Sequence, residues 1–203
     1  MSQATTLIFN IIYVRGTVQP LLPMLSTLLA HSSCQYRMVS NACLLEEEAL
    51  LQRYAAVEPQ LHFYSLNTQK IASHHEAMHE LLRLDDGPYF AMMDSDIFAT
   101  APFEEELLQA LEQHKAVFTG LPIWHEHSDG VMPADFRIMG GRFYKAHNDM
   151  MLGMTYCAIY HKAPLQTFIQ EQGINLASYT WSELPKPKQA QLKSLGMCKH
   201  FYD

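Results

Sequence analysis

Basic clusters are the first thing this sequence lacks. Its 203 residues hold 14 Lys and Arg against 21 Asp and Glu, which gives a formal charge of −7, and the basic residues are spread along the chain. Nucleic-acid-binding proteins usually carry a basic patch or stripe. The sequence therefore disfavours a nucleic acid as the partner.

Paired cysteines and long apolar runs are missing as well. The four cysteines are scattered with no Cys-x-x-Cys pair, at Cys34, Cys43, Cys157 and Cys198. This pattern indicates the reduced thiols of a cytoplasmic protein rather than a disulfide framework. The apolar run over residues 7–14 is too short to cross a bilayer, and neither a basic start nor a cleavage site marks it as a signal peptide. We therefore expect a cytoplasmic protein without a transmembrane segment.

Glycine-rich phosphate loops are also absent, since the sequence contains neither G-x-x-x-x-G-K-[ST] nor G-x-G-x-x-G. The chain therefore lacks the glycines that P-loop and dinucleotide-binding sites require.

What the sequence does have is a regular alternation of strand and helix patterns. Apolar strands are predicted over 7–14, 36–39, 61–66 and 89–93, separated by helices over 20–30, 46–57 and 71–84. This order predicts an α/β fold with a mostly parallel central sheet flanked by helices. Further elements are predicted over 102–114 (helix), 116–124 and 151–160 (strands), 165–172 and 189–195 (helices). We expect one domain over 1–203, with an irregular loop at 124–150 and a C-terminal segment at 173–203.

The sequence is organised around the apolar strand that ends at Asp94-Ser95-Asp96. Side chains at i and i+2 point to the same side of a strand, so the two carboxylates should converge where open α/β sheets hold ligands. Hard carboxylate oxygens suit Mg²⁺ or Mn²⁺. The alternative is a turn in which the acids cap the next element.

A second motif, His75-Glu76-Ala77-Met78-His79, matches H-E-x-x-H within a predicted helix. Its two histidines share a face and could bind Zn²⁺, with Glu76 as general base and a third ligand from Glu104–Glu106. The alternative is a solvated polar helix face.

The element order, with Asp94-Ser95-Asp96 ending a buried strand about halfway along, resembles the GT-A glycosyltransferase superfamily over roughly residues 5–172. The haloacid dehalogenase phosphatases share the Asp-x-Asp pattern but want Thr or Val two residues after the second acid, where this chain has Phe98. The resemblance implies a Rossmann-like GT-A fold and a transferase that uses a nucleotide-diphosphate sugar. It also implies that the later strand over 153–160 lines the donor-sugar and acceptor site. The residues that it assigns to the donor nucleotide are Tyr13, Val14, Arg15, Ser40, Asn41, Asp94 and Ser95.

The same resemblance implies a Mn²⁺ or Mg²⁺ ion on Asp94 and Asp96 that bridges the two phosphates. It offers His200 as a third metal ligand, the helix N-terminus at His74 and His75 beside the donor sugar, and Glu183 as a catalytic base. Each of these three has a simpler interpretation, as an exposed tail, a polar helix face and a solvated loop.

The implied partners are a UDP- or GDP-sugar and a glycan or lipid-linked acceptor. Two other functions stay open: a zinc hydrolase built on the H-E-x-x-H motif, and a non-catalytic sugar-nucleotide-binding domain. Members of the superfamily usually continue beyond this point, so the sequence is read either as a shortened piece or as a reduced member.

Overall fold

The computed structural model describes residues 7–84, 87–118, 144–145, 151–152, 156–173, 176 and 181–194. Two compact units make up the chain. The first comprises residues 1–117 and 156–176, and the second comprises residues 118–155 and 177–203. None of the described helices is both long and apolar enough to cross a membrane.

A six-stranded sheet with the order β3-β2-β1-β4-β8-β5 forms the centre of the first unit. Strands β1 to β4 are mutually parallel where they pair, and β8 runs antiparallel to β4. The strands are β1 (Ile8–Val14), β2 (Gln35–Asn41), β3 (Leu61–Ser65), β4 (Tyr89–Met93), β5 (Ala116–Phe118) and β8 (Cys157–His161). The predicted fold class, an α/β fold with a mostly parallel sheet flanked by helices, is confirmed.

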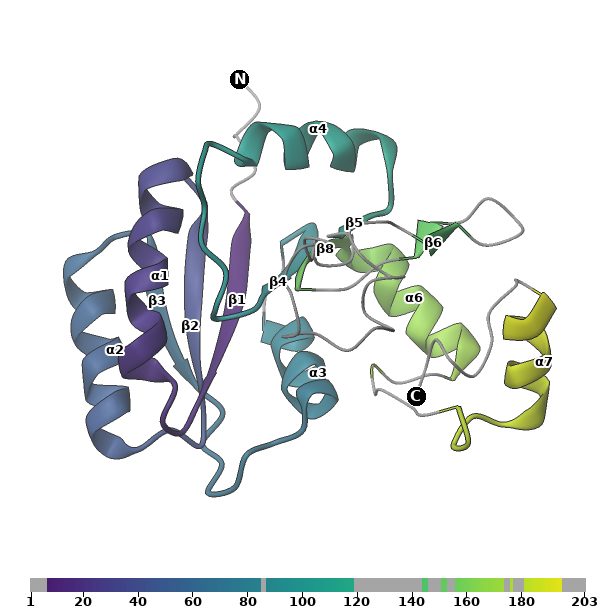
Figure 1. Cartoon of the computed structure of the whole chain (residues 1–203), viewed down its shortest axis with the longest axis horizontal. Coiled ribbons are helices and arrows are strands. Elements are labelled where there is room, and N and C mark those ends of the chain that lie inside the picture. The colour runs from purple at the N-terminus through teal and green to yellow at the C-terminus, as the bar shows by residue number, and fades with distance from the viewer. Residues whose placement is uncertain are drawn as a thin grey trace, which may run out of the picture. The chain divides into compact units, whose positions relative to one another are not determined.

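Helices cover both faces of this sheet (Figure 1). They are α1 (Val18–His31), α2 (Leu45–Val57), α3 (His74–Leu84), α4 (Glu104–Gln113) and α6 (Lys162–Gln172). One buried cluster joins α1, α2 and α4 to alternate strand residues such as Phe9, Ile11 and Met93. A second cluster joins α3 to the opposite strand face, through Leu81 and Met92. Burial of one such Leu or Met side chain contributes about 2 kcal/mol, so these two layers fix the sheet between them.

The connections between the strands leave an opening between β1 and β4. The chain steps outward from β1 to β2 to β3, then returns past β1 to add β4 on its other side. The connections therefore leave the carboxyl ends of β1 and β4 in opposite directions, which is where open α/β sheets form a ligand crevice.

Helix α3 begins at His74, three residues later than the predicted start at Ile71. The side chain of Asn41, at the end of β2, bonds both backbone groups of Ala72 and so holds that residue in an extended loop. The Glu76 carboxylate then caps the helix: it accepts from the Ser73 backbone N–H at 2.8 Å and from the Ser73 hydroxyl at 2.6 Å. The apolar spacing of residues 71–84 could not show this later helix start, because it is set by a side chain thirty-one residues before Ala72.

The strand predicted over 151–160 divides into two elements. Residues Met151–Leu152 form β7, which pairs with β6 (Tyr144–Lys145) in a separate sheet, and Cys157–His161 form β8. Of the strand predicted over 116–124, the described part is β5. The predicted loop over 124–150 lies almost wholly outside the described residues.

The described part of the second unit contains one longer helix, α7 (Lys186–Ser194). Its second residue, Pro187, fits because the N–H that proline lacks would have no helical acceptor in the first turn. Gln189 donates to the carbonyls of Trp181 and Leu184, and the Lys193 amine lies 5.9 Å from the Trp181 ring centroid. These contacts tie the helix to the turn before it.

Candidate functional site

A cleft of about 370 Å³ opens at the carboxyl ends of β1 and β4. Its wall combines apolar strand residues, a loop and the two acids of the central motif. The lining residues are Ile12, Val14, Asn41, Ile71, Ala72, His74, Met92, Met93, Asp94, Ser95 and Asp96. This volume is in the range of small-molecule sites.

Apolar side chains from neighbouring strands line one part of the cleft. Ile12 and Val14 alternate with Tyr13 along β1, so they face the cleft while Tyr13 faces the opposite layer. Tyr13 is 1% exposed, and burial raises the pKa of its phenol well above the usual value. Arg15 is exposed in the turn after β1. Of the three residues predicted from this strand tip, Val14 alone lines the cleft.

The two acids of the Asp-x-Asp motif both line the cleft, directly after β4. The Asp94 N–H donates to the Tyr156 carbonyl at 2.7 Å, and the Asp94 carbonyl accepts from Ile97 at 3.4 Å, which holds the motif in a turn beside β8. Burial, followed by the charge of Asp96, raises the pKa of the Asp94 carboxyl, whereas His74 lowers it. The two carboxylates therefore repel each other across the cleft wall.

A divalent cation fits this pair, because two hard oxygen donors that repel one another are stabilised by a positive charge between them. The described residues offer no cluster of three or more His, Cys, Asp or Glu side chains around a metal position. His200, the third ligand that the resemblance implies, lies outside the described residues. Asp94 and Asp96 are thus the two described residues that would hold such an ion.

The loop wall of the cleft is held by Asn41. This side chain is 2% exposed; its Nδ2 donates to the Ala72 carbonyl at 2.9 Å and its Oδ1 accepts from the Ala72 N–H at 2.8 Å. The amide is therefore engaged with the backbone, and it presents Ile71 and Ala72 to the cleft. Ile71 is 58% exposed there, a large apolar side chain at the entrance.

Ser40, the neighbour of Asn41, is fully buried and is not one of the cleft-lining residues. Its hydroxyl donates to Glu48 Oε1 at 2.6 Å, and Ser65 donates to the same oxygen at 2.9 Å. This arrangement joins β2 and β3 to α2.

The N-terminus of α3 brings His74 to the cleft, whereas His75 is not one of the lining residues. His75 Nδ1 lies 3.0 Å from the Ser73 hydroxyl, and the Glu76 carboxylate caps the helix. Those cap bonds lower the pKa of Glu76. His79, the last residue of the H-E-x-x-H run, accepts from the Leu176 N–H at 3.4 Å. All three motif side chains therefore have partners within the fold, and Glu76 serves as a helix cap.

The predicted site residues omit five lining residues: Ile12, Ile71, Ala72, Met92 and Met93. Strand alternation could have placed Ile12 and Met92 on the face of Val14. Nothing local to Ile71 or Ala72 indicated their position, since the contact of Asn41 with Ala72 sets it. Glu183, the predicted base, lies in the turn before α7, in the second unit.

No protein family and no curated protein matches the sequence significantly. Solved structures do match, at low identity. A mannosyltransferase from Pyrobaculum calidifontis, in complex with GDP-Man and Mn²⁺, has a TM-score of 0.51 at 12% identity over 84% of this chain and 48% of its own. Residues 1–349 of TarS from S. aureus give 0.54 at 12% identity over 94% and 55%, and TarS has also been solved with UDP-GlcNAc.

A 4-diphosphocytidyl-2C-methyl-D-erythritol synthase from Anaerococcus prevotii is similar as well, with a TM-score of 0.52 at 14% identity over 87% of this chain and 81% of its own. The chain spans about half the length of the mannosyltransferase and of residues 1–349 of TarS. At these identities the likeness concerns the fold. The chain has the mostly parallel α/β fold of GT-A-type glycosyltransferases.

Proposed function

We propose that the protein is a metal-dependent glycosyltransferase that moves a sugar from a nucleotide-diphosphate donor to a hydroxyl acceptor. The observation that carries this proposal is the cleft between β1 and β4, which Asp94 and Asp96 line together with apolar side chains. The GT-A-type fold supports it, because two of the similar structures are complexes with nucleotide sugars.

Each part of the cleft suits a different part of such a donor. Ile12, Val14 and Ile71 form an apolar slot that accepts the flat faces of a nucleobase. Asn41 keeps the loop wall in place. Asp94 and Asp96 would hold Mn²⁺ or Mg²⁺, which supplies positive charge to the leaving diphosphate.

In the proposed reaction the bond between the sugar C1 and the phosphate oxygen breaks, and a bond from the acceptor oxygen to C1 forms. The electron pair of the broken bond stays with the nucleoside diphosphate, and the acceptor proton passes to a base. Glu183 remains the candidate for this base, and His200 the candidate for a further metal ligand. The acceptor is proposed to be a hydroxyl of a glycan or of a lipid-linked glycan.

Isothermal titration of UDP and of GDP, with and without Mn²⁺, tests the proposal. We expect saturable binding that needs Mn²⁺ and that Asp96→Asn weakens on the order of 100-fold, because the variant loses a charged metal donor. The matched control is Glu105→Gln, which removes one exposed carboxylate from α4, away from the cleft. Absence of binding both with and without Mn²⁺, or equal binding by the Asp96 variant, would reject the proposal.

A second candidate is a sugar-nucleotide-binding domain without catalysis. The similar structures that hold nucleotide sugars are as compatible with donor binding alone as with transfer. Slow hydrolysis of a panel of nucleotide sugars distinguishes the two functions. Mn²⁺-dependent binding together with no donor hydrolysis would support the binding domain.

A further inference from the structure

A second cavity of about 540 Å³ lies in the same unit, near the start of β4 rather than its end. Pro88 precedes β4, and His161 pairs with Tyr89 at the end of the antiparallel strand β8. The lining residues are Arg83, Gly87, Pro88, His161, Lys162, Ala163, Pro164 and Gln166. Among the residues that the structure describes, this lining includes two cationic side chains and no Asp or Glu, in a chain of net charge −7.

Lys162 is the unusual member of this cavity because it is a lysine that is only 8% exposed. Lysine is almost never buried to this extent unless its charge is paired. Among the described residues, no hydrogen bond or ion pair is recorded for the Lys162 ammonium group, and no fully buried side-chain nitrogen or oxygen lacks a partner. The ammonium group must therefore reach open space, and the space that Lys162 lines is this cavity.

The first turn of α6 also lines the cavity, and the N-terminal end of the helix dipole adds partial positive charge there. Its N-cap residue, His161, makes no side-chain cap, and the turn carries no acidic residue. The Lys162 N–H donates to the Pro88 carbonyl at 2.8 Å, and Pro164 has no N–H. Of the first three backbone positions, Ala163 is left to donate to a ligand. The helix dipole repels a cation beside the helix N-terminus. An anion bound there would be attracted by both the dipole and the cation.

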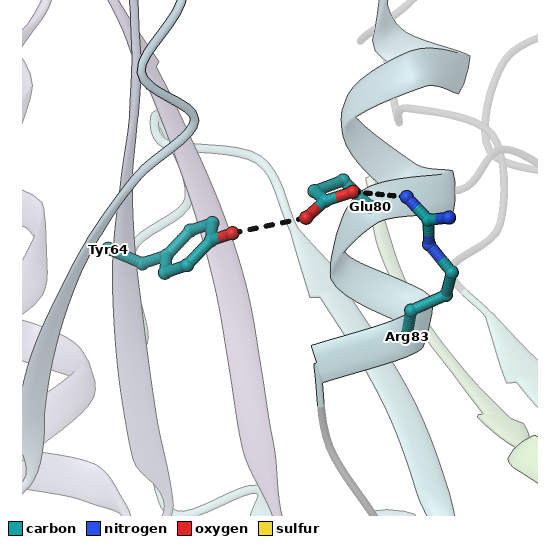
Figure 2. A network of polar contacts seen from close by, with 3 residues as sticks. All are labelled: Tyr64, Glu80 and Arg83. Atoms are coloured by element: carbon teal, nitrogen blue, oxygen red, sulfur yellow. Dashed lines mark hydrogen bonds and ion pairs between the residues drawn. The ribbon is translucent and has the colours of Figure 1, made fainter.

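The remaining walls are held in place by the fold. His161 Nε2–H donates to the Leu111 carbonyl at 2.8 Å, and its ring packs edge-on against Tyr89. Arg83 forms an ion pair with Glu80, which also accepts from the Tyr64 hydroxyl at 3.3 Å (Figure 2). Arg83 is 75% exposed, so it borders the cavity as a second, solvated positive charge.

We propose that this cavity is an anion site that binds a phosphate group through Lys162, the Ala163 N–H and Arg83. A tetrahedral phosphate can accept from an ammonium group, a backbone N–H and a guanidinium at the same time. The cavity is larger than a phosphate ion, so it takes the phosphate of a small phosphorylated molecule. The site is separate from the cleft at Asp94, and the inference does not depend on the proposed function.

Titration with inorganic phosphate at constant ionic strength, followed by backbone amide NMR shifts of the full chain, tests this site. We expect a saturable shift of the Ala163 amide that Lys162→Met weakens about tenfold or more, because the variant keeps the stem and loses the charge. Lys186→Met is the matched control, since Lys186 is also the first residue of a helix but is exposed. It should leave the Ala163 shift unchanged.

Two further experiments complete the test. Lys162→Arg should restore most of the phosphate-induced shift, and the titration of the wild type remains interpretable even where a variant folds poorly. Sedimentation with phosphatidylcholine vesicles that contain phosphatidic acid identifies a lipid as the phosphate source if binding requires Lys162; otherwise the source is soluble. A non-saturating shift in the wild type, or an equal shift in Lys162→Met, would overturn the proposal.

Discussion

The two cavities near opposite ends of β4 are built alike but have opposite charge. Each is lined by the first residue of a helix, His74 of α3 in the cleft and Lys162 of α6 in the second cavity. In the cleft, Asp94 and Asp96 provide the negative charge, and Glu76 caps the helix. In the second cavity, Arg83 and Lys162 provide positive charge and no side chain caps the helix.

This difference shows how one sheet can hold two kinds of ligand. A helix N-terminus attracts anions in both places, but the Glu76 carboxylate already bonds the Ser73 N–H at the start of α3. The cleft therefore suits a cation between its acids, whereas the second cavity suits an anion directly.

The largest expected effect concerns Asn41, which belongs to the cleft alone. Asn41→Ala leaves the Ala72 N–H and carbonyl without their partners, so we expect a loss of about 2–3 kcal/mol in the free energy of unfolding. Nucleotide affinity should fall about tenfold, because the loop wall at Ile71 is no longer fixed. Denaturant unfolding and calorimetry measure the two effects.

Thr68→Ala is the control for Asn41, since it removes only a 3.5 Å contact to Asn41 Oδ1. If phosphate binding at Lys162 weakened as much as nucleotide binding in Asn41→Ala, the two cavities would not be independent.

The next effect concerns Ser40, which we expect to be structural. Ser40→Ala should lower the free energy of unfolding by about 1 kcal/mol, because one hydrogen bond to Glu48 is lost. Ser65→Ala removes the other bond to the same oxygen and is its matched control. Both variants should change nucleotide affinity less than about twofold. Weaker nucleotide binding in Ser40→Ala alone would restore the ligand role that the sequence predicted for Ser40.

The charge of Asp94 gives a prediction for pH. Its folded-state pKa is raised, so ionisation opposes folding, and this cost grows as pH rises from the ordinary carboxyl pKa through the raised one. Without metal at neutral pH, Asp94→Asn should therefore melt about 2 °C above the wild type. The gap should close once the pH falls below the ordinary pKa.

Mn²⁺ should reverse this order, because it stabilises the wild type and not the variant. Calorimetric melting across pH, with and without Mn²⁺, measures both parts. The same order in both conditions would separate Asp94 from metal binding.

The smallest effect compares the two ends of α3. Glu80→Gln removes the acid that pairs with Arg83, so phosphate affinity at the second cavity should rise about twofold. Glu76→Gln changes the same residue type at the other end of the helix and should leave phosphate affinity unchanged. Amide shifts of Ala163 report both. A stronger response in Glu76→Gln would contradict the separation of the two sites.

Part of the cleft could be predicted because it follows local rules. The strand alternation and the position of Asp94 and Asp96 after an apolar run depend on periodicity and sheet geometry, which neighbouring residues encode. The start of α3 could not be predicted, because Asn41 determines it through a contact to Ala72 across thirty-one residues. The buried hydrogen bond from Ser40 to Glu48 could not be predicted for the same reason.

The sequence by itself determined the order of strands and helices, the layered α/β class and the pair of acids at the end of β4. Tertiary structure alone decided the direction of β8, which places the start of α6 beside the start of β4 and so brings Lys162 to a cavity with Arg83. The physical reason is that strand direction and cavity formation depend on contacts between segments far apart in the chain. Periodicity records only which side of its own element a residue occupies.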